Sequence, residues 1–474
     1  MAAGPIWAKF SDIWGRKLAL LSAVGIFAVA SILAAVSSSM EMLIAARALQ
    51  GSAGGALMQL MYITISDLFS VRSRALYFGL AGVIWAIAGS VGPLIGGAFT
   101  QLATWRWCFW INLPICGIAF ILILLFLDVH NPQTKLSEGV RAVDWLGTIS
   151  LLAVTLLLLL GLDFGGAIFP WSSPKVICLL VSGALMVGLF VFIEKALARY
   201  PLMPLSIFQD KSNVAVFLVA FAHSTVVIAG EYYLPLYFQA VQQASPLRSG
   251  VLILPMMITE ATIDIATGIF IHQTGYYRGL IWVGTTTMTL GTGLYVTFQT
   301  DTSTATIIGL EIVASVGIAC LFQTPVLAIQ NTVSQADTAT ASAALSFVRN
   351  LATSLSIVLG GVVFQNSMDI RQSTLAAAGL PESVLEALSG SHAAANVDIV
   401  QTLQDPTQRR IAQDAFAWSI RNMFIMYTCI SALGVMASPF IKQHRLKTEH
   451  TETKTGIKQM TERYSQTKTE SDQR

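Results

Sequence analysis

The sequence predicts an all-α polytopic membrane protein with about twelve transmembrane helices. Of its 474 residues, 54% are hydrophobic and 11% are charged, and the mean hydropathy is +0.66. Soluble globular domains carry about a quarter charged residues. The apolar residues here gather into runs of about membrane length, and a backbone in lipid satisfies its hydrogen bonds only in helices or closed barrels. We therefore expect a chain that crosses the bilayer many times.

The composition also argues against several other classes of protein. A net charge of +2 gives no indication of nucleic-acid binding, and we expect no nucleic acid as a partner; the distribution of the charge instead sets the membrane orientation. The sequence contains no P-loop, no dinucleotide fingerprint and no nucleophile elbow, so we expect neither an enzyme nor a cofactor. Five cysteines lie mostly in apolar runs without metal-ligand spacing, so no metal site or disulfide framework is predicted.

The first informative stretch is residues 10–17, FSDIWGRK, directly before an apolar run at 18–36. This charged interruption with a glycine predicts a short loop between two helices. Asp12 is expected to cap a helix start or to pair with a cation, and Arg16 and Lys17 to hold the loop on the cytoplasmic side. The alternative is an ordinary cytoplasmic loop, since any such loop can carry two basic residues.

A second span is expected at residues 42–61, and it contains Arg47 followed by Gln50 and Gly51. An arginine inside the membrane is costly by several kcal/mol, so Arg47 should face a partner or a water-filled cavity. The alternative is a side chain that snorkels to the near surface, because Arg47 lies only a short way into the span.

Residues 81–114 form a third apolar stretch, which is interrupted by Gly82, Gly89, Gly92, Gly96 and Gly97. Glycine costs roughly 1 kcal/mol against alanine in a soluble helix, whereas in lipid the helix forms anyway. Ala88, Gly92 and Gly96 share one helix face and are expected to form a groove for a neighbouring helix. Pro93 is expected to kink this helix. The alternative is an ordinary packed membrane helix that is rich in small residues.

The remaining chain predicts nine further spans, which brings the total to twelve. They are expected at residues 108–127, 145–162, 176–193, 214–238, 250–271, 280–298, 305–329, 343–364 and 418–441. Two segments are expected outside the membrane: a polar extracytoplasmic loop at 367–417 and a disordered cytoplasmic tail at 442–474.

Several ionisable side chains lie inside the predicted spans. They are His223, Glu231, Glu260, Asp264 and Glu311. A carboxylate in apolar surroundings must be paired, wet or protonated. Glu260 and Asp264 are one helical turn apart on the same face, so the pair is expected to share protons in coupled steps, which suits proton transport. The alternative for Asp264 is a structural position near the cytoplasmic interface.

Three of these stretches resemble signatures of the major facilitator superfamily. Residues 8–17 resemble its loop G-x-x-x-D-x-x-G-R-K, with Asp12, Gly15, Arg16 and Lys17 in place and Ala8 at the leading glycine. Residues 88–97 resemble the fifth-helix signature G-x-x-x-G-P-x-x-G-G of its antiporters, with Gly92, Pro93, Gly96 and Gly97 in place and Ala88 at the first glycine. Arg47 followed by Gln50 and Gly51 resembles the fourth helix, whose arginine is linked to proton transfer.

The second half of the chain narrows the resemblance. Residues 231–256 and 321–330 resemble the fourteen-span drug:proton antiporters of fungi, with Gln243 at a position where that group usually has glycine. Residues 271–279, IHQTGYYRG, resemble a worn copy of FSDIWGRK, as the parallel repeat of this fold requires. Only nine residues precede FSDIWGRK, whereas two full spans precede its copy. The resemblance therefore implies a fourteen-spanner that lacks its first helix and most of its second.

The resemblance implies four parts: an incomplete N-terminal helix bundle at 1–128, two linker helices with a cytoplasmic loop at 129–212, a six-helix C-terminal bundle at 213–441, and the tail. It implies a monomeric multi-pass transporter in the plasma membrane or the vacuolar membrane, with a lipid bilayer, protons and a small-molecule substrate as partners. The function implied is proton-coupled efflux of small amphipathic molecules such as drugs, toxins or secondary metabolites. Two alternatives are a nutrient importer of the same fold and a truncated, non-transporting membrane protein.

Overall fold

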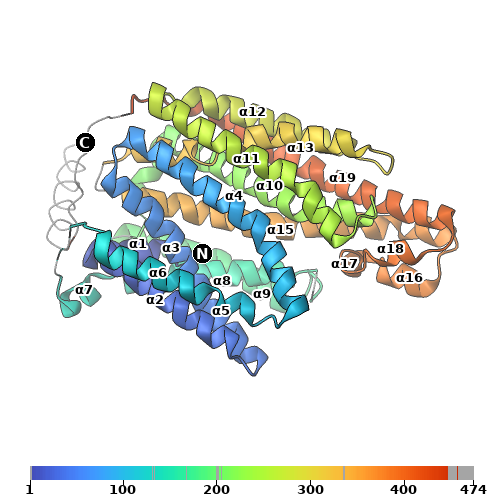
Figure 1. Ribbon diagram of the computed structural model, residues 1–474, viewed down its shortest axis with the longest axis horizontal. Helices are drawn as coiled ribbons and strands as arrows, with labels where there is room; N and C mark the ends of the chain where they lie inside the picture. The colour runs from blue at the N-terminus through green and yellow to red at the C-terminus, as the bar shows by residue number, and fades with distance from the viewer. Residues whose placement is uncertain are drawn as a thin grey trace.

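The computed structural model describes residues 3–130, 132, 134–166, 168–198, 202–203, 205–334, 337–446 and 456. Long helices run side by side along one direction, with the first part of the chain on one flank and the second part on the other (Figure 1). Within the described residues, ten helices are long and apolar enough to cross a membrane. The all-α membrane fold is therefore confirmed, whereas the count of twelve spans stays a prediction.

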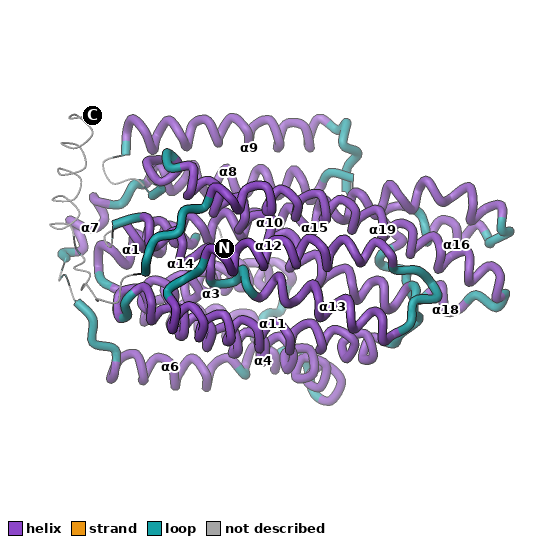
Figure 2. The backbone as a smooth tube through the Cα atoms, turned by 90° about the horizontal axis from the view of Figure 1, so that it is seen from above, coloured by secondary structure: helices purple, strands orange, loops and turns teal. Residues whose placement is uncertain are grey.

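The first part of the chain forms the N-terminal half and a helical hairpin. Its long helices are α2 (Arg16–Ala35), α3 (Met40–Leu68), α4 (Val71–Leu102) and α6 (Asn112–Phe126), and its short ones are α1 (Gly4–Trp14), α5 (Trp107–Trp110) and α7 (Leu136–Ala142). The hairpin consists of α8 (Trp145–Phe164) and α9 (Pro174–Phe192). Figure 2 shows α9 along one flank of the molecule and α6 along the opposite flank.

The C-terminal half contains the larger apolar core. Its long helices are α10 (Lys211–Ala240), α11 (Pro246–Thr274), α12 (Arg278–Leu294), α13 (Thr304–Ala319), α15 (Thr338–Ala377) and α19 (Pro406–Ala437), and its shorter ones are α14 (Thr324–Thr332), α16 (Glu382–Ala387), α17 (Gly390–Ala393) and α18 (Ile399–Thr402). The helices α3 and α12 are not among the ten membrane candidates, although α3 packs against α2 and α12 against α13.

Local sequence accounts for many helix ends. The hydroxyl oxygens of Ser39, Ser70 and Ser245 accept hydrogen bonds from backbone amides in the first turns of α3, α4 and α11. A serine at this position satisfies an amide that has no partner inside the helix. Gly15 and Gly275 end α1 and α11 with φ angles of +94° and +74°, a region that favours glycine. These two breaks occupy corresponding places in the two predicted repeats.

Two expected loops are shorter than the sequence suggested. Most of FSDIWGRK is helical, and the interruption is confined to Gly15 between α1 and α2. The segment predicted as a loop at 367–417 is helical at both ends, because α15 continues to Ala377 and α19 begins at Pro406; its place outside the membrane stays a prediction. Polar composition does not end a helix that projects beyond the apolar layer. Buried Leu375 and Phe416 pack in the same apolar cluster and support these extensions.

The two ends of the molecule differ. Figure 1 shows α7 and the described end of the chain at one end, and α16–α18 at the other. Gly456 donates its backbone N–H to the carbonyl of Asp12 over 2.8 Å, so this part of the tail lies beside the Gly15 break. The rest of the tail lies largely outside the described residues. The segments predicted as cytoplasmic and extracytoplasmic thus lie at opposite ends, and which end faces the cytoplasm stays a prediction.

Candidate functional site

A buried charge cluster surrounds the Gly15 break. The guanidinium of Arg16 contacts Asp12 Oδ1 and Asp67 Oδ2, each over 2.6 Å, and donates to Ser11 Oγ over 2.6 Å. All four side chains lie near the start of α2, and the Arg16 residue is 2% exposed. A buried cation needs such compensation, because an unpaired charge away from water is strongly unfavourable. Asp12 thus pairs with a cation, which is one of its two expected roles.

The chain at Gly15 lies close to the segment that follows α6. A Cβ on Gly15 would stand 2.9 Å from Pro132 Cδ, and its φ angle lies in the glycine region. Lys17 is half-buried, and it takes part in none of the ion pairs among the described residues. The predicted group Asp12, Gly15 and Arg16 therefore comes together in space. Sequence inspection missed Asp67, which follows Arg16 by 51 positions at the end of α3.

The two halves are tied at this same end. Arg74, near the start of α4, donates to Gln330 Oε1 of α14 over 3.0 Å, and Gln330 donates to Ser342 Oγ of α15 over 2.9 Å. Arg72 donates to the carbonyls of His272 and Gln273 at the end of α11. Charge-assisted hydrogen bonds of this kind are about twice as strong as neutral ones. They hold the start of α4 to the C-terminal half.

Further along α4, the contact with α11 is made through glycines. A Cβ on Gly82 would stand 2.0 Å from Asp264 Oδ2, and one on Gly79 would stand 3.1 Å from Gln323 Nε2. On the other side, a Cβ on Gly268 would stand 2.6 Å from the carbonyl oxygen of Ala75. Small residues allow helix backbones to approach closely in a membrane. This face of α4 is the close-packed one.

The groove expected at Ala88, Gly92 and Gly96 is not the one that packs here. Ala88 and Gly92 are exposed, and among the described residues nothing lies within 4 Å of a Cβ built on Gly92 or Gly96. The side chains of Pro93 and Gly97 lie outside the described residues, although the helix is continuous through both. Figure 1 shows the last part of α4 turning away from α11. The contact between α4 and α11 reaches as far as Gly89, where a Cβ would stand 3.6 Å from Met257 Cε, and the last part of α4 leaves α11.

Asp264 is a buried carboxylate in the middle of this contact. It is 2% exposed, and its Oδ1 and backbone carbonyl accept hydrogen bonds from Gln323 Nε2 over 2.6 and 3.0 Å. Glu260, one turn earlier on α11, is 7% exposed, and its Oε1 has no hydrogen-bond partner within the described chain. The pair is thus buried, as expected, but the two carboxyl groups differ in their partners.

Arg47 lies apart from this pair. Its Nη1 donates to Gln50 Oε1 over 2.8 Å, and Gln50 Nε2 donates to Ser31 Oγ of α2 over 2.9 Å. The guanidinium carbon stands 5.8 Å from the centre of the Phe109 ring. Arg47 itself is exposed, and its recorded contacts connect α3 with α2 and α5. The structure therefore does not bring Arg47 together with Glu260 or Asp264.

The comparison with known families decides the identity of this arrangement. A sequence model described as Major Facilitator Superfamily matches residues 1–357. The chain belongs to the major facilitator superfamily. Its members are transporters, so the buried polar contacts between the two halves belong to a transporter.

Relatives of this superfamily cover nearly the whole chain. The chain is 44% identical over 456 residues to a protein named efflux pump dotC of Dothistroma septosporum, which covers 96% of this chain and 78% of the relative. It is 42% identical to MFS-type transporter ppz2 of Metarhizium majus, and this alignment also covers 96% of this chain and 78% of the relative. It is 33% identical to the acurin A biosynthesis cluster MFS-type transporter of Aspergillus aculeatus, and this alignment covers 94% of this chain and 80% of the relative.

Solved structures agree on the superfamily fold. The human organic anion transporter MFSD10 aligns with a TM-score of 0.53 at 17% identity, over 91% of this chain and 80% of that chain. A fucose:proton symporter of E. coli aligns with a TM-score of 0.53 at 10% identity, and the alignment covers 93% of this chain and 88% of that chain. Identities this low support the fold and nothing about substrate.

Sequence inspection missed one further charge of this major facilitator. Arg349 of α15 donates to the carbonyls of Leu321 and Phe322 over 3.2 and 2.9 Å, and it lies within electrostatic reach of Asp264. The signal was present, because Arg349 is an arginine inside the predicted span 343–364, as Arg47 is inside another. Gln323, which holds Asp264, is a neutral residue and gave no such signal.

Two further ionisable side chains are buried in the C-terminal half, His223 and Glu311. His223 of α10 forms a 3.0 Å hydrogen bond between its Nε2 and the carbonyl of Ile318. Glu311 of α13 is fully buried, and neither carboxylate oxygen has a partner among the described residues. No group of three or more His, Cys, Asp or Glu side chains suited to a metal ion occurs in the part that the structure describes.

Proposed function

We propose that the chain is a proton-coupled efflux transporter of small amphipathic molecules that works by alternating access of its two halves. The observation that carries this proposal is the buried carboxylate of Asp264, which lies where α4 of one half touches α11 of the other. A carboxylate inside the membrane is energetically costly. Such residues are therefore rare, and they typically mark ion and substrate pathways.

The contact gives a physical route from protonation to movement. In the arrangement described here, Asp264 is shielded from water by Gly82 and Gln323. Separation of α4 from α11 would replace the Gly82 contact by water, whereas Gln323, which belongs to the same half as Asp264, would stay beside the carboxyl group. A shielded carboxyl group is more stable neutral, and a hydrated one is more stable ionised. Binding and release of one proton therefore favour opposite arrangements, and this difference moves the halves.

Glu260 supplies a second protonatable group on the same face of α11. It lies one turn from Asp264, and its Oε1 has no partner in the described residues. Two carboxyl groups this close do not ionise independently, so the pair takes up and releases protons in coupled steps. Arg47 joins α3 to α2 through Gln50, and we propose that its positive charge tunes this step.

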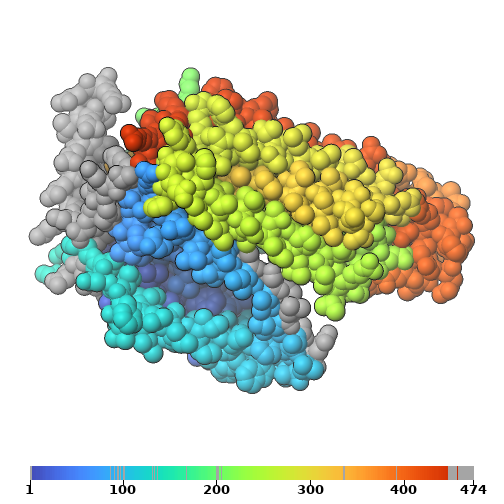
Figure 3. Space-filling model, turned by 45° about the horizontal axis from the view of Figure 1, so that its top comes forward, coloured from blue at the N-terminus to red at the C-terminus, as the bar shows by residue number. Residues whose placement is uncertain are grey.

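The substrate enters a cavity between the halves. On the face shown in Figure 3, the surface of the N-terminal half is hollowed between α4 and α6, with the first helices at its floor; both flanking helices belong to one half, so this hollow is not itself the proposed cavity. Relatives named efflux pumps, and one named for a biosynthesis cluster, support export of small amphipathic metabolites. We further propose a monomer of the fourteen-span group that resides in the plasma membrane, with the vacuolar membrane as the alternative location.

Efflux measurements test the proposal. Cells that express the full chain are loaded with the fluorescent amphipathic cation rhodamine 6G, and its loss is followed with and without a protonophore. We expect faster loss than in empty cells, and we expect the protonophore and Asp264→Asn to abolish the difference. Asp398→Asn, an exposed carboxyl group outside the membrane, should leave it unchanged. Net uptake would favour the importer, and no flux in either direction would favour a non-transporting membrane protein.

A further inference from the structure

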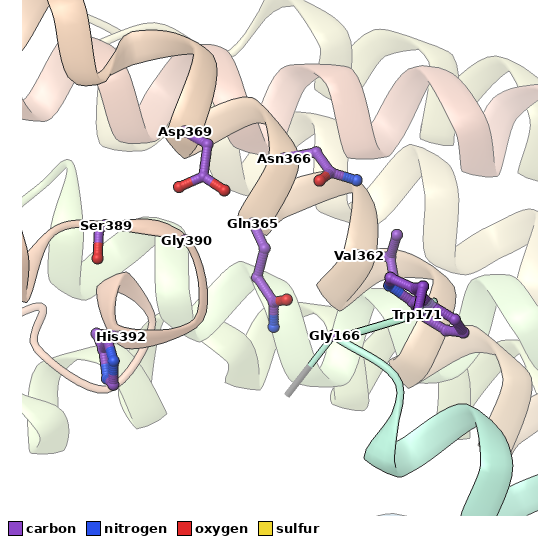
Figure 4. A pocket seen from close by; sticks show the side chains of 9 residues that line it. All are labelled: Gly166, Trp171, Val362, Gln365, Asn366, Asp369, Ser389, Gly390 and His392. Atoms are coloured by element: carbon purple, nitrogen blue, oxygen red, sulfur yellow. The ribbon is translucent and has the colours of Figure 1, made fainter. Parts of the chain in front are cut away.

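A separate pocket lies at the end of the molecule opposite Gly15. It has a volume of about 320 Å³ and lies between the loop that joins α8 to α9, the helix α15 and the short helix α17. Figure 4 shows its polar lining. The lining side chains with polar atoms are Trp171, Gln365, Asn366, Asp369, Ser389 and His392. This volume is at the lower end of the range of about 300–1,000 Å³ that small-molecule sites occupy.

One wall is held rigidly against α15. Gln372 Nε2 donates to the carbonyl of Leu388 over 2.9 Å, and Leu388 itself is fully buried in the apolar cluster of the C-terminal half. Gly390 has a φ angle of +25°, and a Cβ there would stand 2.9 Å from Asp369 Oδ1. Only a glycine lets the chain turn this close to the Asp369 carboxylate. These contacts fix residues 388–390 against α15, so the wall belongs to the packed structure of the C-terminal half.

The opposite wall presents an indole ring. Trp171 lies over Gly165 and Gly166, where a Cβ would stand 2.5 Å and 2.7 Å from the ring atoms. The loop is closed by a hydrogen bond from Gly166 N–H to the carbonyl of Phe169 over 2.8 Å. Because glycines leave room for the ring, Trp171 keeps a fixed position, and it is 40% exposed.

The polar groups between these walls remain available. Within the part of the chain that the structure describes, no recorded hydrogen bond engages the side chains of Gln365, Asn366, Asp369 or His392. Ser389 donates its hydroxyl to the carbonyl of Glu386 over 2.7 Å, which leaves its oxygen free to accept. The set therefore mixes donors and acceptors around one aromatic ring.

We propose that this pocket binds a neutral, hydroxyl-rich group, such as a sugar ring or a polyol, in addition to any substrate cavity between the halves. A hydroxyl both donates and accepts, so it matches side-chain amides, a carboxylate and an imidazole at once. The carbon face of a sugar ring is apolar and packs on an indole, whose ring has a large apolar area.

Other ligand classes fit less well. An anion would need a cation, and no lysine or arginine is among the described residues that line the pocket. A divalent metal ion prefers several carboxylate or carbonyl oxygens, and this lining supplies one carboxylate and one imidazole. A purely apolar ligand would make no use of the polar side chains, of which Asn366, Asp369 and His392 are exposed and Gln365 is half-buried.

Binding to the purified full chain tests the proposal. The protein is prepared in a detergent without a sugar head group, because glucoside detergents would compete. Phenyl β-glucoside is the probe, phenyl ethyl ether is the control ligand, and affinity is measured by calorimetry. We expect saturable binding of the glucoside and none of the ether. Trp171→Ala and Asp369→Ala should each weaken binding by about tenfold or more.

Matched variants separate the pocket from general effects. Trp145→Ala removes an exposed indole at the other end of α8, and Asp398→Ala removes an exposed carboxylate close to α18; both should bind as the parent does. If Trp171→Ala does not fold, Asp369→Asn and Gln365→Leu, each checked for a single symmetric elution peak, give the same comparison. Equal affinity in pocket and control variants, or equal binding of the ether, would overturn the proposal. Neither readout depends on transport, so the efflux proposal is tested independently.

Discussion

Gly82 of α4 lies directly against the carboxylate of Asp264 of α11, so that a Cβ on Gly82 would stand 2.0 Å from Asp264 Oδ2. The contact joins the two halves of a major facilitator, and its carboxylate is also held by Gln323 of the C-terminal half. Steric fit and charge therefore meet at one point. A substitution that pushes Gly82 and Asp264 apart therefore changes both the packing of α4 on α11 and the surroundings of the carboxylate.

The first prediction follows from this fit. Gly82→Ala should force α4 away from α11 or displace the Asp264 carboxylate, and overpacking of this kind typically costs about 1–3 kcal/mol. We expect a lower melting temperature and a large loss of efflux. Gly92→Ala is the matched control, because its Cβ would meet nothing within 4 Å. Equal melting temperatures for the two variants would contradict the described contact.

A second prediction concerns the predicted groove at Ala88, Gly92 and Gly96. These residues lie on a face of α4 that does not pack on α11 here, so a helix can pack on them only in another arrangement of the halves. Gly92→Leu should therefore leave the melting temperature close to that of the parent and still abolish transport, because the closed state would be overpacked. Cell-surface amount and efflux are measured together. Parental efflux from Gly92→Leu would show that no helix packs on this face during the cycle.

The buried cluster around Arg16 gives a third prediction. Removal of one partner from a buried ion pair costs about 3–5 kcal/mol, because the other charge is left uncompensated. Asp67→Ala and Asp12→Ala should thus lower the melting temperature strongly, whereas Asp398→Ala should not. Arg16→Lys should recover only part of the loss in Arg16→Ala, since lysine lacks the fork that reaches both carboxylates. Melting is followed by thiol-reactive or intrinsic fluorescence in detergent.

Energy coupling gives a fourth prediction. Arg47→Ala should nearly eliminate protonophore-sensitive efflux, and Arg47→Lys should restore part of it, because lysine keeps the charge but loses the planar donors that reach Gln50. Substrate binding should survive both changes. If Arg47→Ala leaves protonophore-sensitive efflux intact, Arg47 is a structural residue and the coupling belongs to Glu260 and Asp264.

The fifth prediction concerns orientation. The α16–α18 end is predicted to be extracytoplasmic, and the end that carries α7 cytoplasmic. In a background without native cysteines, Ser383→Cys should react with an impermeant maleimide on intact cells, and Lys135→Cys should react only after permeabilisation. Both positions are exposed, so accessibility within the fold does not explain a difference. The reverse pattern would invert the proposed topology.

The local pattern of residues already determined much of this protein. Long apolar runs predict membrane helices, because a backbone in lipid must form its hydrogen bonds within its own segment. The glycine in FSDIWGRK predicts a break, which the structure places at Gly15. The expected cationic partner of Asp12 is Arg16, four residues along the chain. The motifs that resemble the major facilitator superfamily identify the family, as the comparisons confirm.

Tertiary structure alone decided which residues meet. Asp67 and Gln323 are separated by 51 and 59 positions from the side chains they bind, so no local pattern could pair them. The rotation of α4 about its axis, which places Gly79 and Gly82 rather than Gly92 against α11, was equally hidden. In a membrane, lipid is as apolar as a protein core, so hydrophobicity does not mark the face of a helix that turns inward.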